Sequence, residues 1–74
     1  IKLHEDNEAI RLFDELLTHD PDYVGSYYHL GKALEKTGNI DQALEIYQKG
    51  IRIAQKLKDD HARRELQQAA DDLI

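Results

Sequence analysis

The sequence contains no cysteine among its 74 residues. Neither a disulfide nor a thiolate-bound metal can therefore hold the chain together. A domain of this length buries a modest core and usually needs a staple, very regular packing or a neighbouring molecule. We expect its stability to come from helix packing or from contacts with another chain.

Long apolar runs and clusters of basic residues are also missing. No stretch approaches the roughly 20 apolar residues that cross a bilayer, and no basic start followed by an apolar segment resembles a signal peptide. The formal net charge is −5, and the acidic residues are spread along the chain, which opposes binding to nucleic acid or to anionic lipid. We expect no nucleic-acid or membrane partner and a cytoplasmic location. Because the chain starts at Ile1 instead of methionine, a targeting segment can be missing from a longer parent.

The residue types that carry catalysis or bind metals do not form a recognisable set. Ser26 is the only serine, and neither a Ser-His-Asp order nor a glycine-rich phosphate loop can be read. The histidines are far apart, and only His61 shares a helical face with a carboxylate, Glu65, whereas a zinc site needs three or four convergent ligands. The acidic pairs at 59–60 and 71–72 point apart if they are helical. The sequence predicts no enzyme activity, no cofactor and no metal site.

The residues that are abundant favour helices. Leu, Ala, Glu, Lys and Gln dominate, whereas Val, Thr and Phe are few. Apolar residues recur every three or four positions in four segments, which is the pattern of amphipathic helices. The sequence predicts a single all-α domain of antiparallel helices, with nothing assigned to residues 1–5 and helices at about 6–18, 23–37, 40–57 and 60–73.

Turn and capping residues mark the helix boundaries. Pro21 ends the first helix because proline cannot continue its hydrogen bonds, and Asp22 is expected to cap the second helix. Gly38 should end that helix in the left-handed conformation. Asn39 begins a capping-box pattern for the third helix, and Asp60 is expected to cap the fourth.

Gly31 lies on the apolar face of the second predicted helix, together with Tyr27 and Leu30. A glycine inside a helix costs about 1 kcal/mol relative to alanine, so it needs a packing reason. We expect the third helix to come close at this point, with Ala43 as the small residue opposite Gly31.

The chain repeats itself when it is shifted by 34 positions. Apolar residues of the first helix then fall on those of the third: Ala9 on Ala43, Ile10 on Leu44, Leu12 on Ile46, Phe13 on Tyr47 and Leu17 on Ile51. Self-similarity at a fixed period marks a repeat array, whose units bury their faces by stacking on neighbours.

This period and the residues at fixed places in it resemble the tetratricopeptide repeat family. The matching residues are Tyr27, Leu30, Gly31, Leu34, Gly38, Ala43, Tyr47, Gly50 and Ile51. Ala9, Phe13 and Pro21 resemble the second half of a preceding repeat, and the last helix resembles the polar helix that closes such arrays. Gln55 departs from the pattern, because the family has a proline there. The resemblance implies a half repeat, one full repeat and a capping helix, as in small stand-alone bacterial members of the family.

In this family the first helix of each pair lines a concave groove that holds peptides. The residues that occupy the matching positions are Gly25, Tyr28, Lys32 and Glu35. The resemblance therefore implies a non-catalytic module for protein–protein interaction, with Tyr28 as an aromatic contact. Alternatively, Tyr28 packs against neighbouring helices and the two charged side chains are only solvated.

The first predicted helix lacks the partner helix that a complete repeat would supply, so its outer apolar face should be bare. Ile10, Leu12 and Leu16 are the candidates for pairing with a second copy of the chain. The alternative function is thus a structural one, in which the chain assembles with itself as a homodimer.

Overall fold

The computed structural model describes residues 2–74, with side chains from Glu5 onward. Its helices are α1 (Lys2–His19), α2 (Gly25–Lys36), α3 (Ile40–Leu57) and α4 (Asp60–Asp71). No strand occurs in these residues. The all-α class and the four antiparallel helices predicted from the sequence are confirmed.

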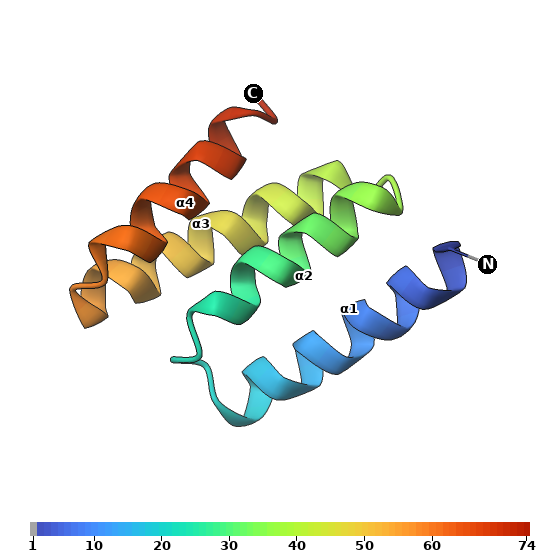
Figure 1. Ribbon diagram of the computed structural model, residues 1–74, viewed down its shortest axis with the longest axis horizontal. Coiled ribbons are helices and arrows are strands. Elements are labelled where there is room, and N and C mark those ends of the chain that lie inside the picture. Colours follow the sequence, from blue (N-terminus) through green and yellow to red (C-terminus); the bar gives the residue numbers. More distant parts are fainter. Residues whose placement is uncertain (1) are drawn as a thin grey trace.

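Each helix lies beside the one that follows it in the chain (Figure 1). α2 lies between α1 and α3, and α4 packs on α3 and also reaches α2. Within the described chain, the backbone of α1 comes close to no helix except α2. α2 and α3 therefore form the centre of the molecule, and α1 forms a flank.

Three helix boundaries differ from the prediction. α1 begins at Lys2 instead of about residue 6, because residues 2–5 contain no glycine or proline that would stop a helix. α2 begins at Gly25 instead of Tyr23, since the turn after α1 continues through a hydrogen bond from Tyr23 N to Asp20 O (3.2 Å). α4 ends at Asp71 instead of residue 73, and the chain then turns.

The predicted caps of α2 and α3 are wrong. Val24 precedes α2 and makes no side-chain cap, while the Asp22 carboxylate lies 3.3 Å from Lys56 Nζ on α3. Asn39 does precede α3, but its side chain does not accept from the helix; its Nδ2 donates instead to Thr37 Oγ1 at 2.8 Å. Asp22 thus joins the turn before α2 to α3, and the Asn39 side chain bonds within its own turn.

The cap of α4 lies one residue earlier than predicted. Asp59 Oδ1 accepts a hydrogen bond from Ala62 N at 3.1 Å, so Asp59 is the capping residue and Asp60 is the first residue of the helix. An acid in that first turn still favours the helix through its dipole.

Two helices end in the same left-handed turn. Gly38 has φ 83°, and the next residue, Asn39, donates its N–H to Leu34 O at 2.8 Å. This confirms the predicted glycine cap of α2. α3 ends in the same way at Lys58, with φ 57° and a bond from Asp59 N to Ala54 O at 2.8 Å, although no glycine marks the site.

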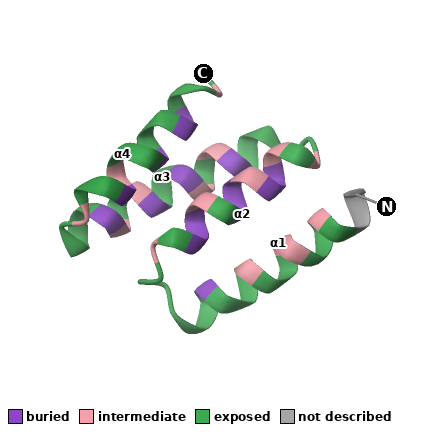
Figure 2. Ribbon diagram, viewed as in Figure 1, coloured by how far each residue is buried: buried purple, intermediate pink, exposed green. Residues whose placement is uncertain are grey.

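The core lies among α2, α3 and α4. Figure 2 shows most of the buried residues on these three helices. The largest fully buried side chains are Tyr27, Tyr47 and Leu66, one from each helix. α1 contributes a single buried apolar residue in its described part, Leu17, which is 8% exposed.

Two glycines allow α2 and α3 to pack closely, and each receives a tyrosine from the other helix. A Cβ on Gly31 would overlap the ring of Tyr47, and a Cβ on Gly50 would lie 2.6 Å from Tyr27 Cβ. The expectation that Gly31 makes room for the third helix is therefore correct. The residue opposite it is Tyr47 and not Ala43, which is nonetheless fully buried.

Each buried tyrosine brings its hydroxyl out to a partner. Tyr27 donates to Pro21 O at 2.6 Å, and Tyr47 donates to the Glu35 carboxylate. Burial raises the pKa of both phenols, and in Tyr47 the hydrogen bond to Glu35 raises the pKa further. Both tyrosines are therefore held in their neutral, donating form.

Candidate interaction surfaces

Tyr28 lies at the centre of the surface that the sequence assigns to peptide binding. Its side chain is half-buried and packs on the core. Its ring is edge-on to His29, with ring centres 5.8 Å apart and planes at 80°, and tilted towards Tyr47 at 6.4 Å. Lys32 Nζ lies 5.5 Å from the centre of the ring, within range of a cation–π contact. The ring is thus fixed by its neighbours but not covered on all sides.

Lys32 and Glu35 continue this surface along α2. Lys32 Nζ is 3.6 Å from Glu35 Oε2, and the two side chains are 37% and 24% exposed. The Glu35 carboxylate also accepts a hydrogen bond from the Tyr47 hydroxyl. Tyr28, Lys32 and Glu35 are thereby joined in one contact network.

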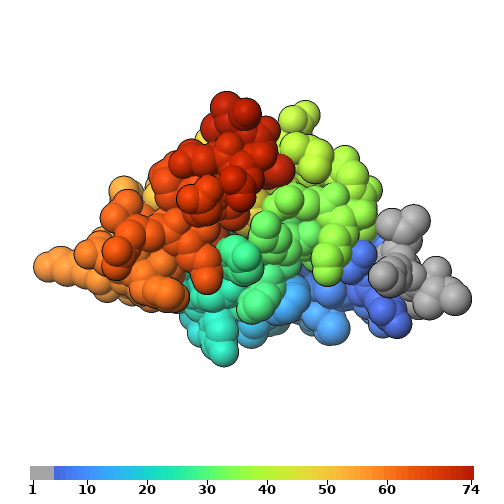
Figure 3. Space-filling view, turned by 45° about the horizontal axis from the view of Figure 1, so that its top comes forward, coloured from blue at the N-terminus to red at the C-terminus, as the bar shows by residue number. Residues whose placement is uncertain are grey.

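Gly25 stands apart from that network. It is exposed at the start of α2, and a Cβ added to it would meet nothing within 4 Å. The structure therefore brings three of the four predicted groove residues together and leaves the fourth as open backbone beside them. In the space-filling view of Figure 3, atoms of α4, α2 and α1 lie in successive bands across one face of the molecule.

His29 also lies in this region, although the sequence pattern predicted no role for it. It is exposed, and its ring stacks on Phe13 of α1 at 5.7 Å with planes 17° apart. The periodicity of either helix alone gives no signal for the pair, because it depends on the register between α1 and α2.

The three residues suggested for self-assembly do not lie together. Leu12 and Leu16 are 60% and 37% exposed on α1. Ile10 is half-buried, packs on the core and lines a cavity on another side of the helix. Only the two leucines therefore form a bare apolar surface.

The internal repeat explains why those leucines are bare. Position 16 corresponds to Gly50 of α3 after the shift of 34 residues. Gly50 is buried, and a Cβ there would meet Tyr27 of α2 and Leu66 of α4. α1 has neighbours of this kind on one side only, since among the described helices its backbone approaches α2 alone.

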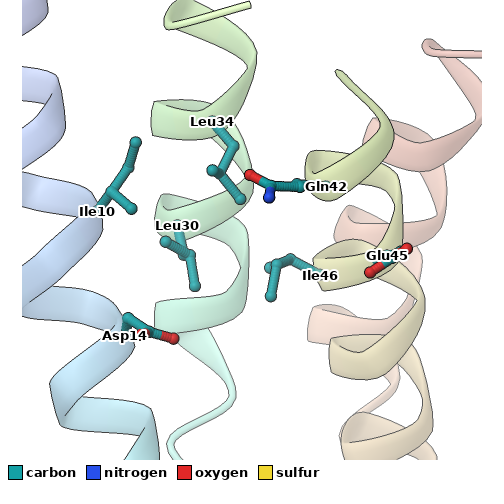
Figure 4. Close-up of a pocket in the computed structure, with 7 residues that line it drawn as sticks. All are labelled: Ile10, Asp14, Leu30, Leu34, Gln42, Glu45 and Ile46. Atoms are coloured by element: carbon teal, nitrogen blue, oxygen red, sulfur yellow. The ribbon is translucent and has the colours of Figure 1, made fainter. Parts of the chain in front are cut away.

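A cavity of about 290 Å³ lies between α1 and α3, with α2 as its floor (Figure 4). Its lining residues are Ile10, Asp14, Leu30, Leu34, Gln42, Glu45 and Ile46. A smaller cavity of about 80 Å³ shares Asp14, Leu30 and Ile46 with it and continues to Leu17 and Lys49. Sequence patterns did not indicate this region, because α1 and α3 are brought to either side of α2 only by the fold.

Among the described residues, no group of three or more histidines and acids is placed to hold a metal ion. No helix in residues 2–74 is both long and apolar enough to cross a membrane.

Comparisons with known proteins agree on one relationship. A family model described as tetratricopeptide repeat matches residues 7–70. The solution NMR structure of a tetratricopeptide repeat domain protein from Salinibacter ruber has a TM-score of 0.89 at 40% identity, covering 93% of this chain and 70% of that one. A crystal structure of a tetratricopeptide repeat domain protein from the same organism has a TM-score of 0.87 at 41% identity, covering 92% and 76%. No protein of curated function matches the sequence.

Proposed function

The chain belongs to the tetratricopeptide repeat family, and we propose that it binds a peptide segment of another protein through the α2 surface of Tyr28, Lys32 and Glu35, with Gly25 at its start. Proteins with this fold generally mediate protein–protein interactions and are typically non-catalytic scaffolds. The proposal assigns that general role to particular residues.

The observation that carries the proposal is the fixed position of the Tyr28 ring. Contacts with His29, Tyr47 and Lys32 hold the ring, so a ligand that packs on it does not have to order it first. Preorganised aromatic side chains are typical binding hot spots for this reason.

The groups beside the ring set the chemistry of the ligand. Lys32 offers a partly exposed ammonium group, while Glu35 is already engaged by Lys32 and by the Tyr47 hydroxyl. Gly25 presents backbone without a side chain, which leaves room for a peptide main chain. We expect a peptide with an apolar side chain over Tyr28 and a carbonyl or carboxylate near Lys32.

The test is a selection of peptides from a random displayed library, followed by affinity measurements on the winning sequences. Tyr28→Ala should weaken binding by about tenfold or more, as loss of an aromatic hot spot does. Tyr23→Ala is the matched control, because Tyr23 is also a tyrosine but is 56% exposed outside this surface. Equal effects of the two changes, or no effect of Tyr28→Ala, would refute the proposal.

Self-assembly through α1 is a second candidate, favoured by the exposure of Leu12 and Leu16. If two copies pair through these leucines, light scattering should show a dimer that forms with rising concentration and that Leu12→Glu dissolves. Leu57→Glu is the control, because Leu57 is a leucine of α3 that is 43% exposed elsewhere. A monomer at all concentrations excludes this function.

A further inference from the structure

The cavity between α1 and α3 is a surface that the proposed function does not use. Its floor consists of Leu30 and Leu34, whereas the peptide surface contains Tyr28 and Lys32 of the same helix. Residues two positions apart on a helix point about 200° apart at 3.6 residues per turn. The two surfaces therefore lie on different faces of α2.

The inside of this cavity is apolar. Figure 4 shows Ile10 of α1 and Ile46 of α3 on either side of Leu30 and Leu34. The two isoleucines are half-buried, so part of their apolar surface still meets water. Covering that surface would be favourable, since burial of apolar area contributes about 25 cal/mol per Å².

The rim of the cavity is acidic. Asp14 on α1 and Glu45 on α3 lie on opposite sides, and the Gln42 side chain of α3 extends towards Leu34. Neither carboxylate forms an ion pair or a side-chain hydrogen bond with the described residues. The lining of this cavity contains no lysine or arginine. The charge that lines this cavity is thus negative, while Lys49 and Arg52 line the neighbouring hollow of α3 together with Glu45.

The size of the cavity limits what can enter it. Its volume of about 290 Å³ is just below the roughly 300–1,000 Å³ of small-molecule sites. It also opens between two helices instead of being enclosed. This shape suits one or two side chains of a protein segment that lies along the groove between α1 and α3.

We propose that this groove binds a second partner segment, one that places large apolar side chains against Ile10 and Ile46 and sets lysine or arginine beside Asp14 and Glu45. Such a basic amphipathic segment matches both the apolar floor and the acidic rim, and helices of this kind commonly dock into grooves between other helices.

The probe is a labelled synthetic helical peptide with leucines three and four residues apart and lysines flanking them. Its affinity is measured by fluorescence anisotropy at low salt. A second peptide with glutamates in place of the lysines reports the charge preference. The lysine peptide should bind at least about tenfold more tightly than the glutamate peptide.

Charge reversal in the protein locates the site. The double change Asp14→Lys with Glu45→Lys should lower the affinity for the lysine peptide by about tenfold or more and should raise the affinity for the glutamate peptide. The control is Glu15→Lys with Glu65→Lys, which alters the net charge equally at two exposed acids outside the cavity. Circular dichroism verifies that both variants fold.

Two further readouts separate this site from the peptide surface on α2. Tyr28→Ala should leave the affinity for the lysine peptide unchanged, and methyl NMR signals of Ile10 and Ile46 should shift on binding. The inference fails if the lysine peptide does not bind or if the two double variants lower its affinity equally. It also fails if the NMR signals that shift belong to residues outside the cavity. None of these three outcomes bears on binding at Tyr28.

Discussion

α1 and α4 are the two outer helices, and each has one apolar side, yet they are held in different ways. α4 buries Ala62, Leu66, Ala69 and Ala70 and packs on both α3 and α2. α1 packs on α2 alone among the described helices and leaves Leu12 60% exposed. The helix with the smaller side chains is the one that is more fully built into the molecule.

The difference shows that burial depends on the neighbours available and not on the apolar content of a helix. The alanines of α4 let its backbone approach α3 closely, and Leu66 is the one large side chain that enters the core. The outer side of α4 is polar. α1 has the larger apolar residues, but among the described helices none packs on its outer side.

The difference in burial between α1 and α4 is tested most directly by shortening a leucine on each helix. Leu66→Ala should destabilise the protein by about 2–5 kcal/mol, because Leu66 is 1% exposed and its loss leaves a cavity. Leu12→Ala should change stability by no more than about 0.5 kcal/mol, as expected for a surface position. Urea unfolding followed by circular dichroism measures both. Similar losses would mean that α1 is covered in solution, for example by a second copy.

A second test places a large side chain at Gly50, where Tyr27 of α2 and Leu66 of α4 pack on α3. Gly50→Leu gives α3 the residue that α1 has at the equivalent position 16. The new side chain would collide with Tyr27 and Leu66, so we expect a loss of about 1–3 kcal/mol from overpacking. Gly25→Leu is the control, because a Cβ there meets nothing within 4 Å. Thermal unfolding compares the two variants, and an unchanged Tm for Gly50→Leu would contradict the packing described.

A third test uses alkaline pH. Burial first and the bond to Glu35 second raise the pKa of Tyr47, and Asp72 after α4 also contributes. An unfolded tyrosine ionises near pH 10, so the stability from the neutral phenol is complete below that pH and is lost above it. Tyr47→Phe should lower the free energy of unfolding by about 0.5–1.5 kcal/mol at neutral pH. As the pH rises above about 10, this variant should lose less stability than the parent protein does.

Urea unfolding on both sides of pH 10 is the measurement for this third test. Tyr23→Phe is the control, since Tyr23 is 56% exposed. It should unfold like the parent at every pH. If Tyr47→Phe keeps the full alkaline loss of the parent, another group is responsible.

The helices and most of the core could be predicted because they rest on local patterns. The three-to-four spacing located all four helices, and Gly38 signalled its own left-handed turn. A helical face also indicated that Gly31 needs a close neighbour. It could not tell which neighbour, because the choice between Ala43 and Tyr47 depends on how far α3 slides along α2.

The candidate surfaces could likewise be predicted where their residues lie on one helix, but not where they depend on packing between helices. Tyr28, Lys32 and Glu35 share one helix, so their proximity could be read from the sequence. Ile10 was grouped with Leu12 by apolar character, although the two differ by two positions and lie on different sides of α1. The cavity between α1 and α3 joins residues of three helices, and only their packing creates it.

Lys58 gives the smallest and most local of the expected effects. It adopts the left-handed conformation that closes α3 and leads directly into Asp59, the cap of α4. A residue with a Cβ atom is sterically strained in this left-handed conformation, whereas glycine is not. Lys58→Gly should therefore stabilise the protein by about 0.5–1 kcal/mol, partly offset by the freedom that glycine adds to the unfolded chain.

The control for this change is Gln55→Gly, three residues earlier at an exposed position within α3, where glycine should instead destabilise by about 1 kcal/mol. The midpoint of urea unfolding distinguishes the two signs. Because α1 is joined to the rest through α2 and not through this turn, the gain should appear in the unfolding of α3 and α4. Hydrogen exchange should then slow at the α3–α4 junction and stay unchanged along α1. Destabilisation by Lys58→Gly would show that the lysine side chain, and not its backbone angle, matters at this junction.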